Sequence, residues 1–289
     1  MTKGLSVGRI SRPLAGLYLL MWLLAAPMTW AHEEHTGIAK LPNHLDGFDL
    51  TPFLFYWFDP ATESPVDKAQ QQWLDGHFQS LDHQAPNFGF ARGHHWFYVA
   101  LENAQSSRRT VLLEVDYPVL DQLEFYCHGP SGAATYFPAG DHLDYDSRVV
   151  KVRNYVVPLL LEPLTATTCL IRARSETNIV FPLRAFDMLP YIEYSQRVEW
   201  ALGILYGVAL ALLLYNFVLY LSTREALYFY FILHVLGGLG YTTLMDGSLA
   251  NLWISLELQD LGVLGSLCLC VGAAILFGLE FLDVRRTWR

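Results

Sequence analysis

Aromatic and charged side chains between residues 96 and 153 are the groups that could bind a ligand. Trp96 and Tyr98 are two positions apart in an alternating segment, which places both rings on one face of a predicted strand. Flat aromatic faces suit sugar rings. A pair at this spacing is more often part of a sandwich core, so both interpretations stay open.

A loop at residues 141–148 adds charged groups. Its carboxylates, Asp144 among them, could bind a hard cation such as calcium or could belong to a solvated turn. The spacing is not that of a helix–loop–helix calcium site, and no metal is predicted. Arg148 could clamp a ligand, or fasten the loop through a salt bridge to Asp144 or Asp146. Arg153 completes the predicted set of ligand-binding residues.

Motifs for catalysis are not found in the sequence. It has no kinase, cyclase or phosphatase signature and no nucleotide-binding loop. A glycan hydrolase, the enzymatic alternative, needs two carboxyl groups about 5–10 Å apart, which a sequence cannot show. We therefore predict no enzyme activity, no catalytic residue and no cofactor.

The charge of the region before the apolar segments narrows the partners. Residues 32–199 hold 22 Asp plus Glu against 12 Lys plus Arg, a net charge of -10. Such a domain would be repelled by nucleic acid and by anionic lipid headgroups. Cations, neutral sugars and proteins remain as candidates.

Four cysteines are divided between two regions. Cys127 and Cys169 lie in the part predicted to be exported, where an oxidising compartment permits a disulfide. The sequence does not show whether their Cβ atoms approach to about 3.8 Å. Cys268 and Cys270 lie in an apolar segment and are interpreted as small apolar side chains.

Alternation and β-branched or aromatic enrichment predict short strands in the exported part. We place them at residues 96–102, 111–116, 122–128, 149–158, 169–175 and 179–186, with turn formers at 103–110 and 129–146. One helix is predicted at 67–81, with Trp73, Leu74, Phe78 and Leu81 on one side. Many short strands predict an all-β jelly roll or sandwich over residues 45–190.

Near residue 200 the sequence changes from a domain suited to water to segments suited to a lipid bilayer. Uncharged apolar stretches follow at 200–221, 226–245 and 261–279, and the first covers roughly 33 Å at 1.5 Å per residue. We predict a partial α-helical transmembrane domain of three spans over residues 200–289, after a connector at 191–199.

The N-terminus is typical of a signal peptide. Lys3, Arg9 and Arg12 precede an apolar run at 14–26 that is short for a span. Cleavage after Ala31 would leave a linker at 32–44, and an uncleaved anchor is the alternative. Either one exports residues 32–199.

The distribution of basic residues predicts the orientation of the spans across the membrane, independently of the signal peptide. Arg224 lies between the first two spans, residues 246–260 contain no Lys or Arg, and Arg285, Arg286 and Arg289 lie in the tail. Because Lys and Arg favour cytoplasmic loops, this pattern agrees with an exported N-terminal domain.

Small and polar residues within the spans are predicted to pack helices. Gly203, Gly207 and Ala211 form a stripe at spacing four that fits a helix of another chain or a further helix of the same chain. Asn216 could hydrogen-bond across helices. His234 could titrate in a signalling step or simply bond a neighbouring helix.

Several motifs follow one another in a fixed order. The first part carries WFYVALEN at 96–103, LLEVDYP at 112–118, LDQLEFY at 120–126, GDHLDYDSR at 140–148 and YVVP at 155–158. The membrane part carries GILYG at 203–207, LLLYN at 212–216 and YFYFI at 228–232. Over roughly residues 45–282 the chain resembles bacterial seven-transmembrane receptors with diverse intracellular signalling modules.

The resemblance implies a periplasmic jelly roll, similar to carbohydrate-binding modules, in a multi-pass protein of the bacterial inner membrane. In that family ligand occupancy passes to an intracellular output, commonly a diguanylate cyclase or a histidine kinase. The expected partners are a small-molecule or carbohydrate ligand and membrane lipid, without nucleic acid.

The sequence departs from the family by ending after three predicted spans, with no output domain. We therefore expect the input half of a receptor and a fragment of a longer protein. The alternatives are a short receptor acting through a partner output protein or as a homo-oligomer, and a regulatory membrane subunit that senses nothing.

Overall fold

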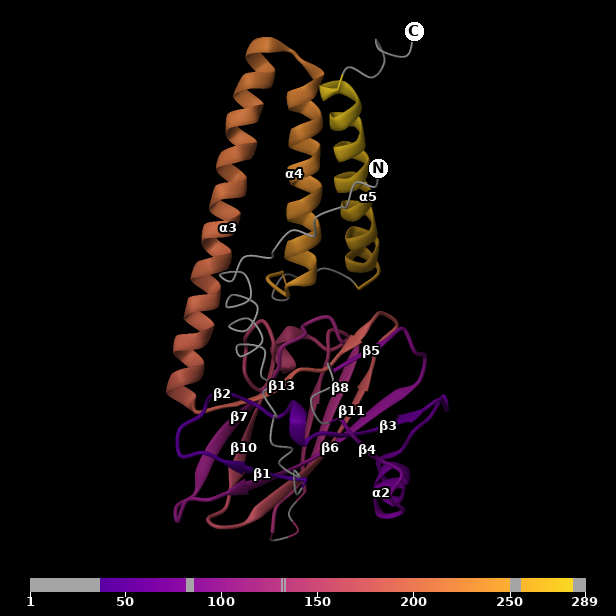
Figure 1. Cartoon of the computed structure of the whole chain (residues 1–289), viewed down its shortest axis with the longest axis vertical. Coiled ribbons are helices and arrows are strands. Elements are labelled where there is room, and N and C mark those ends of the chain that lie inside the picture. Colours follow the sequence, from indigo (N-terminus) through magenta and orange to yellow (C-terminus); the bar gives the residue numbers. More distant parts are fainter. Residues whose placement is uncertain (1–36, 82–85, 131, 133, 250–255, 283–289) are drawn as a thin grey trace, which may run out of the picture. The chain divides into compact units, whose positions relative to one another are not determined.

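The structure is a computed structural model that describes residues 37–81, 86–130, 132, 134–249 and 256–282. It shows a β-sandwich followed along the chain by three long helices (Figure 1). The predicted signal peptide, the first part of the linker and the arginines of the tail lie outside the described residues.

The larger sheet has seven strands in the order β4-β3-β6-β11-β8-β9, with β1 also paired to β6. Its strands are β1 (Ile38–Leu41), β3 (Phe55–Asp59), β4 (Gln79–Ser80), β6 (His94–Asn103), β8 (Gln122–His128), β9 (Ala134–Ala139) and β11 (Ala166–Arg174). Only the β1–β6 pair is parallel. The long strand β6 therefore organises the sheet.

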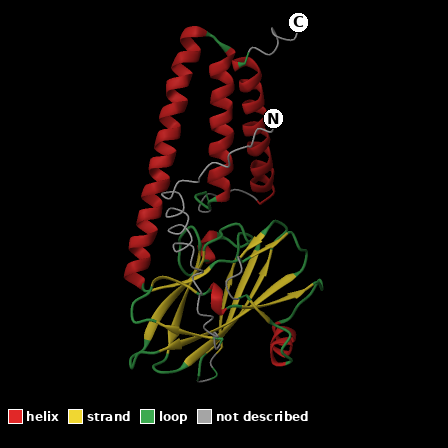
Figure 2. Ribbon diagram, in the orientation of Figure 1, coloured by secondary structure: helices red, strands yellow, loops and turns green. Residues whose placement is uncertain are grey.

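The second sheet has four strands in the order β10-β7-β13-β2. Its strands are β2 (Asp46–Asp49), β7 (Arg109–Val115), β10 (Tyr155–Leu161) and β13 (Leu183–Phe186), and a short pair joins β5 (Asn87–Gly89) to β12 (Ile179–Val180). Short helical turns occur at η1 (Thr51–Phe53) and η2 (Tyr145–Ser147), and α2 spans Val66–Leu74. Figure 2 shows the strands gathered in this part of the chain.

The core lies between the two sheets because alternate residues of each strand point inward. Phe97 and Val99 of β6 and Leu113 of β7 are fully buried there. Phe97 stacks on Phe181 with ring centroids 3.9 Å apart. Each such side chain contributes about 1.5–3 kcal/mol through removal from water.

Neighbouring strands β8 and β11 are also joined covalently. Cys127 and Cys169 are directly opposite in the register of the two strands, and the structure links them in a disulfide. Both side chains are buried in the core.

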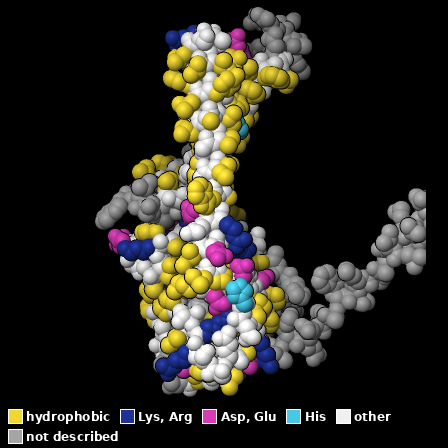
Figure 3. All heavy atoms as spheres, turned by 90° about the vertical axis from the view of Figure 1, so that its left-hand side faces the viewer, with side chains coloured by type: hydrophobic (Ala, Val, Ile, Leu, Met, Phe, Trp, Pro, Cys, Tyr) yellow, Lys and Arg dark blue, Asp and Glu magenta, His cyan; other side chains and the backbone are white. Residues whose placement is uncertain are grey.

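Three helices follow the sandwich: α3 (Met188–Thr223), α4 (Ala226–Met245) and α5 (Leu256–Phe281). All three are long and apolar enough to cross a membrane. At most 6% of the residues in each apolar window are buried within the chain. Their outward surfaces are therefore hydrophobic (Figure 3) and suited to lipid or to further helices.

The prediction of an all-β sandwich followed by membrane-spanning helices is confirmed, with local corrections. Strand β10 begins only at Tyr155, because the preceding residues form a loop. The strand predicted at 179–186 is interrupted at Pro182, which has no backbone N–H for a ladder. Six strands were not predicted: β1, β2, β3, β4, β5 and β9. Of these, β4 lies within the predicted helix at 67–81, and β9 lies where turn formers suggested a loop.

The predicted helix at 67–81 is too long. It ends at Leu74, and Gly76 then turns the chain with a positive φ of 75°. This left-handed conformation is one that glycine adopts at little cost. Leu74 is 72% exposed whereas Phe78 and Leu81 are buried, so the prediction that they share one side of a helix was wrong.

Candidate functional site

Two rows of side chains cross the outward face of the larger sheet. The inward positions of its strands belong to the core, so the alternate positions must face outward. The strand register aligns Trp57, Trp96, Arg172, Glu124 and Pro138 in one row, and Phe55, Tyr98, Leu170, Tyr126 and Tyr136 in the other. The rows place aromatic and charged groups side by side.

Helix α2 covers the β3–β6 end of this face. Trp73 stacks on Tyr98 with ring centroids 3.5 Å apart, and it meets Phe55 edge-on. Trp96 is fully buried and donates its indole N–H to the hydroxyl of Ser64 at 2.8 Å. Trp96 therefore cannot touch a ligand, which corrects its expected role, and Tyr98 has its ring covered.

The β8–β9 end of the same face is open. Tyr136 is 51% exposed, and its ring centroid lies 5.1 Å from that of the half-buried Tyr126. Beside them Arg172 forms an ion pair with Glu124 and lies over the Trp96 ring. We call Glu124, Tyr126, Tyr136 and Arg172 the binding face.

Hydrogen bonds hold the polar groups of the binding face in place. The Tyr136 hydroxyl donates to Glu124 at 2.9 Å, and Arg172 donates to the backbone carbonyl of Ser64 at 2.7 Å. Burial, followed by the bond to Glu124, raises the pKa of Tyr136 to about 12. The phenol therefore stays neutral, and the face offers two rings with a fixed carboxylate and guanidinium.

The sequence carried one signal for this face. In β8 the apolar positions 123, 125 and 127 alternate with Glu124 and Tyr126. This alternation indicates that Glu124 and Tyr126 both face outward. Tyr136 was missed because its strand was taken for a loop.

The charged loop does not join the binding face. Asp144 is exposed at the start of η2. Arg148 lies between the rings of Tyr145 and Tyr155, at 5.1 and 4.8 Å, and donates to the carbonyls of Val152 and Arg153 at 3.0 Å. Of the two alternatives for Arg148, the contacts agree with fastening of the loop, but through backbone carbonyls and aromatic rings in place of a salt bridge to Asp144 or Asp146.

Arg153 contacts the segment after α4, where its guanidinium donates to the carbonyl of Asp246 at 3.2 Å. The structure thus separates Arg153 from Trp96 and Tyr98.

Asp121, Asp141 and His142 bring three potential metal-ligand atoms within 4.8 Å of one another. The two oxygens of Asp121 already accept hydrogen bonds from Ser175 and from the backbone of Glu176. A structural role in joining two loops accounts for the cluster.

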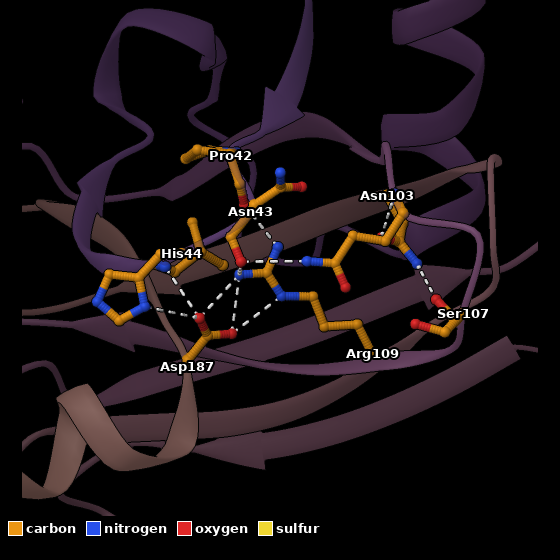
Figure 4. A network of polar contacts seen from close by, with 9 residues as sticks. Pro42, Asn43, His44, Asn103, Ser107, Arg109 and Asp187 are labelled. Atoms are coloured by element: carbon orange, nitrogen blue, oxygen red, sulfur yellow. Dashed lines mark hydrogen bonds and ion pairs between the residues drawn. The ribbon is translucent and has the colours of Figure 1, made fainter.

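The start of α3 is fixed by a paired charge. Asp187 precedes the helix, and Arg109 of β7 donates to its two carboxylate oxygens at 2.9 Å each (Figure 4). Arg109 also donates to the carbonyls of Pro42 and Asn43, and Leu45 donates its backbone N–H to Asp187. The start of α3 is therefore anchored to strand β7 of the second sheet.

A second polar group joins β7 to the first turns of α3. Glu114 accepts hydrogen bonds from Asn154 at 2.9 Å and from Tyr191 at 3.4 Å. Asp116 accepts from Asn154 at 2.7 Å and from Tyr194 at 3.5 Å. We call Glu114, Asp116, Asn154, Tyr191 and Tyr194 the joint cluster.

The residues predicted to pack membrane helices have different surroundings. Gly203, Gly207 and Ala211 are exposed on α3. Asn216 donates to Leu212 of its own helix at 2.8 Å, which corrects its expected bond across helices. His234 of α4 does reach a neighbouring helix, at 3.0 Å from the carbonyl of Cys270 on α5.

Two family models match the chain. Residues 51–187 match the model described as 7TMR-DISM extracellular 2, and residues 199–289 match 7TM diverse intracellular signalling. The first range covers most of the sandwich, and the second covers α4, α5 and the part of α3 from residue 199 onward.

Other comparisons add no functional information. No curated protein matches the chain. Among solved structures, a GH115 4-O-methyl-alpha-glucuronidase, BtGH115A, with specificity for decorated arabinogalactans, has 11% identity and a TM-score of 0.22. The likeness covers 36% of this chain and 15% of that enzyme. At this level it supports no inference about fold or activity.

Proposed function

Because the chain belongs to the seven-transmembrane receptors with diverse intracellular signalling modules and forms the input half of such a sensory receptor, we propose that its β-sandwich binds a carbohydrate. The binding event is conveyed to the membrane helices. Neither matched family model describes a catalytic domain, and the proposal assigns no reaction to this chain.

The binding face is the observation that carries this proposal. Tyr126 and Tyr136 offer an exposed pair of rings, on which the apolar face of a sugar ring could stack. Glu124 and Arg172 lie beside the rings with their geometry fixed by hydrogen bonds. Acceptors and donors held in this way suit the hydroxyls of a neutral ligand, which agrees with the acidic charge of the domain.

Helix α3 supports the second half of the proposal. It runs without interruption through 36 residues, about 54 Å at 1.5 Å per residue. A bilayer core needs only about 20 residues, so the first turns of the helix belong to the sandwich. A ligand that favours one packing of the sandwich against α3 would shift the balance between two receptor states.

The proposed location is the bacterial inner membrane, with the sandwich in the periplasm. The recipient of the signal would be an intracellular module of the kind found in this family, a diguanylate cyclase or a histidine kinase. The disulfide between Cys127 and Cys169 suits an oxidising compartment outside the cytoplasm.

A thermal-shift experiment tests the binding site. The full chain is placed in lipid nanodiscs and its sandwich is unfolded by heat with a panel of soluble oligosaccharides. A ligand at 100 times its Kd should stabilise the native state by about 2.7 kcal/mol. Tyr136→Ala should remove this shift, because it deletes the exposed ring.

Two variants serve as controls for that experiment. Tyr136→Phe keeps the ring and loses the bond to Glu124, so it should retain part of the shift. Leu160→Ala removes an exposed apolar side chain from the other sheet and should retain all of it. An oligosaccharide shift that is unchanged in Tyr136→Ala would exclude the binding face as the site.

A further inference from the structure

Two buried oxygen atoms in the joint cluster have no hydrogen-bond partner among the described residues. They are Oε2 of Glu114 and Oδ1 of Asn154. The two residues are 1% and 3% exposed. Their side chains are already hydrogen-bonded to each other through the other atoms of both groups, Nδ2 of Asn154 and Oε1 of Glu114. Leaving two acceptors buried and unpaired costs about 1–3 kcal/mol each.

The orientation of the Asn154 amide follows from its neighbours. Its Nδ2 lies 2.9 Å from Glu114 and 2.7 Å from Asp116, and both contacts are to carboxylate oxygens. Rotating the amide by half a turn would set its oxygen against those two acceptors. The NH₂ group therefore points toward the carboxylates, and Oδ1 is left without a donor.

The charges around Glu114 oppose one another, because Asp116 raises its pKa whereas Arg184 and Arg153 lower it. Asp116, just after strand β7, is acidic, and Glu199 of α3 lines the same small cavity. Arg184 of β13 is 3.3 Å from Asp116, and Arg153 donates to the carbonyl of Asp246. Tyr191 and Tyr194 of α3 are the remaining titratable neighbours.

Little water can reach the carboxyl group of Glu114 to solvate a charge on it. The cavity beside Glu114 has a volume of about 10 Å³, close to the minimum for one water molecule. Burial, the largest cause, raises the pKa of Glu114, and Asp116 raises it further. The bond from Asn154 and the charges of Arg184 and Arg153 act in the opposite direction, and the net result is a raised pKa.

We propose that Glu114 is a proton-binding site that controls how firmly the sandwich holds the first membrane helix. The bound proton, taken from solvent, lies on Oε2 and is donated to Oδ1 of Asn154, while Oε1 keeps the bond from Nδ2. This closed acid–amide ring satisfies both orphaned oxygens with one proton and leaves no net charge on the pair. When the proton is lost, Oε2 of Glu114 and Oδ1 of Asn154 are again buried without a hydrogen-bond donor, next to Tyr191 of α3.

This device would regulate the receptor proposed above, and only its effect on signalling rests on that function. Proton binding itself requires no ligand. The sandwich can therefore fail to bind oligosaccharides while Glu114 still titrates, and the reverse also holds.

The sign of the pH dependence follows from linkage. A carboxyl group whose pKa is higher in the folded state binds more protons when folded than when unfolded, so stability falls as pH rises through that interval. The interval begins at the ordinary glutamate pKa of about 4.3 and ends at the raised value.

The test compares thermal unfolding of the full chain in nanodiscs between pH 5 and pH 8.5. Glu114→Gln cannot ionise, and its amide can form the same ring with Asn154. Its Tm should exceed that of the parent by an amount that widens by about 3–5 °C per pH unit within the interval and then becomes constant. Glu162→Gln, which changes a surface carboxylate paired with Arg108, should keep the parental slope.

Parallel slopes for the parent and Glu114→Gln would overturn the proposal. If Glu114→Gln fails to fold, infrared spectra of the parent decide the question. A protonated carboxylic acid has a carbonyl band that a carboxylate lacks, and one such band should persist above the pH at which the exposed carboxyl groups have ionised, and it should move in Asn154→Ala. If no band outlasts those of the exposed carboxyl groups, Glu114 ionises with them and the proposal fails.

Discussion

The pairing of Arg109 with Asp187 explains how a single residue can set the start of a long helix. The Arg109 side chain is only 7% exposed, and its guanidinium contacts both oxygens of the Asp187 carboxylate and two backbone carbonyls. A planar donor fork suits such two-point recognition, whereas a lysine ammonium does not.

We predict that Arg109→Ala lowers the free energy of unfolding by about 3–5 kcal/mol, because it leaves the partly buried carboxylate of Asp187 without its ion-pair partner. Denaturant unfolding of the full chain measures this loss. Arg109→Lys should recover only part of it. The neighbouring Arg108→Ala is the matched control, since that side chain is 68% exposed and should change stability by about 1 kcal/mol or less. Equal losses at the two positions would contradict the assigned role.

At the residue scale, the sequence indicated the types of side chain in the candidate site better than it indicated where each side chain lies. It pointed to aromatic and charged residues, yet Trp96 is buried under Arg172, and Arg148 binds carbonyls of its own loop. Cross-strand neighbours decide these outcomes, and they depend on strand register. No local pattern pairs Glu114 with Asn154, which are 40 positions apart.

Between elements, the disulfide fixes β8 against β11. It closes a loop with a sequence separation of 42 residues. In the chain-entropy account such a cross-link stabilises a domain by about 4 kcal/mol.

Replacing both cysteines, Cys127→Ala with Cys169→Ala, should lower the denaturant midpoint by the equivalent of about 4 kcal/mol. The double variant avoids leaving a free buried thiol. Reduction of the parent by dithiothreitol should give a similar midpoint, and Cys268→Ala with Cys270→Ala serves as the control outside the sandwich. An unchanged midpoint after reduction would argue against a structural disulfide.

The backbones of helices α4 and α5 approach closely at Gly237. A Cβ on Gly237 would lie 2.5 Å from the backbone nitrogen of Cys270, whereas one on Gly238 would meet only the Cys270 sulfur at 3.8 Å. Small residues permit such backbone contact in membranes.

We therefore expect Gly237→Leu to separate α4 from α5 and Gly238→Leu to leave them paired. Limited proteolysis in mild detergent would show the difference as faster cleavage in the first variant. Equal cleavage of the two variants would mean that the helices do not pack through Gly237.

At the element scale the apolar spans and the central strands were predictable because long hydrophobic runs and strict alternation are local signals. Strands β1 and β2 were not, since four residues carry too little periodicity. The glycine contact was also missed. The stripe at Gly203 has open space in the described structure, while the close approach occurs at Gly237.

For the whole molecule, the proposed orientation across the membrane can be tested directly. Arg224 lies between α3 and α4, and residues 246–260 contain no Lys or Arg. Alkaline phosphatase fused after residue 248 should be active, because this enzyme folds only outside the cytoplasm, and fused after residue 224 it should be inactive. Green fluorescent protein fusions should give the opposite pattern. Activity of the phosphatase fused after residue 224 would show that the orientation across the membrane is opposite to the one proposed.

In the function proposed above, the two sheets of the sandwich have different tasks. The binding face belongs to the larger sheet, whereas Arg109 and Glu114, which hold α3, belong to β7 of the smaller one. Substitutions in the outward rows of the larger sheet leave the residues that grip the helix untouched. Recognition can therefore diverge during evolution, or be redesigned in the laboratory, while the coupling to the membrane is inherited unchanged.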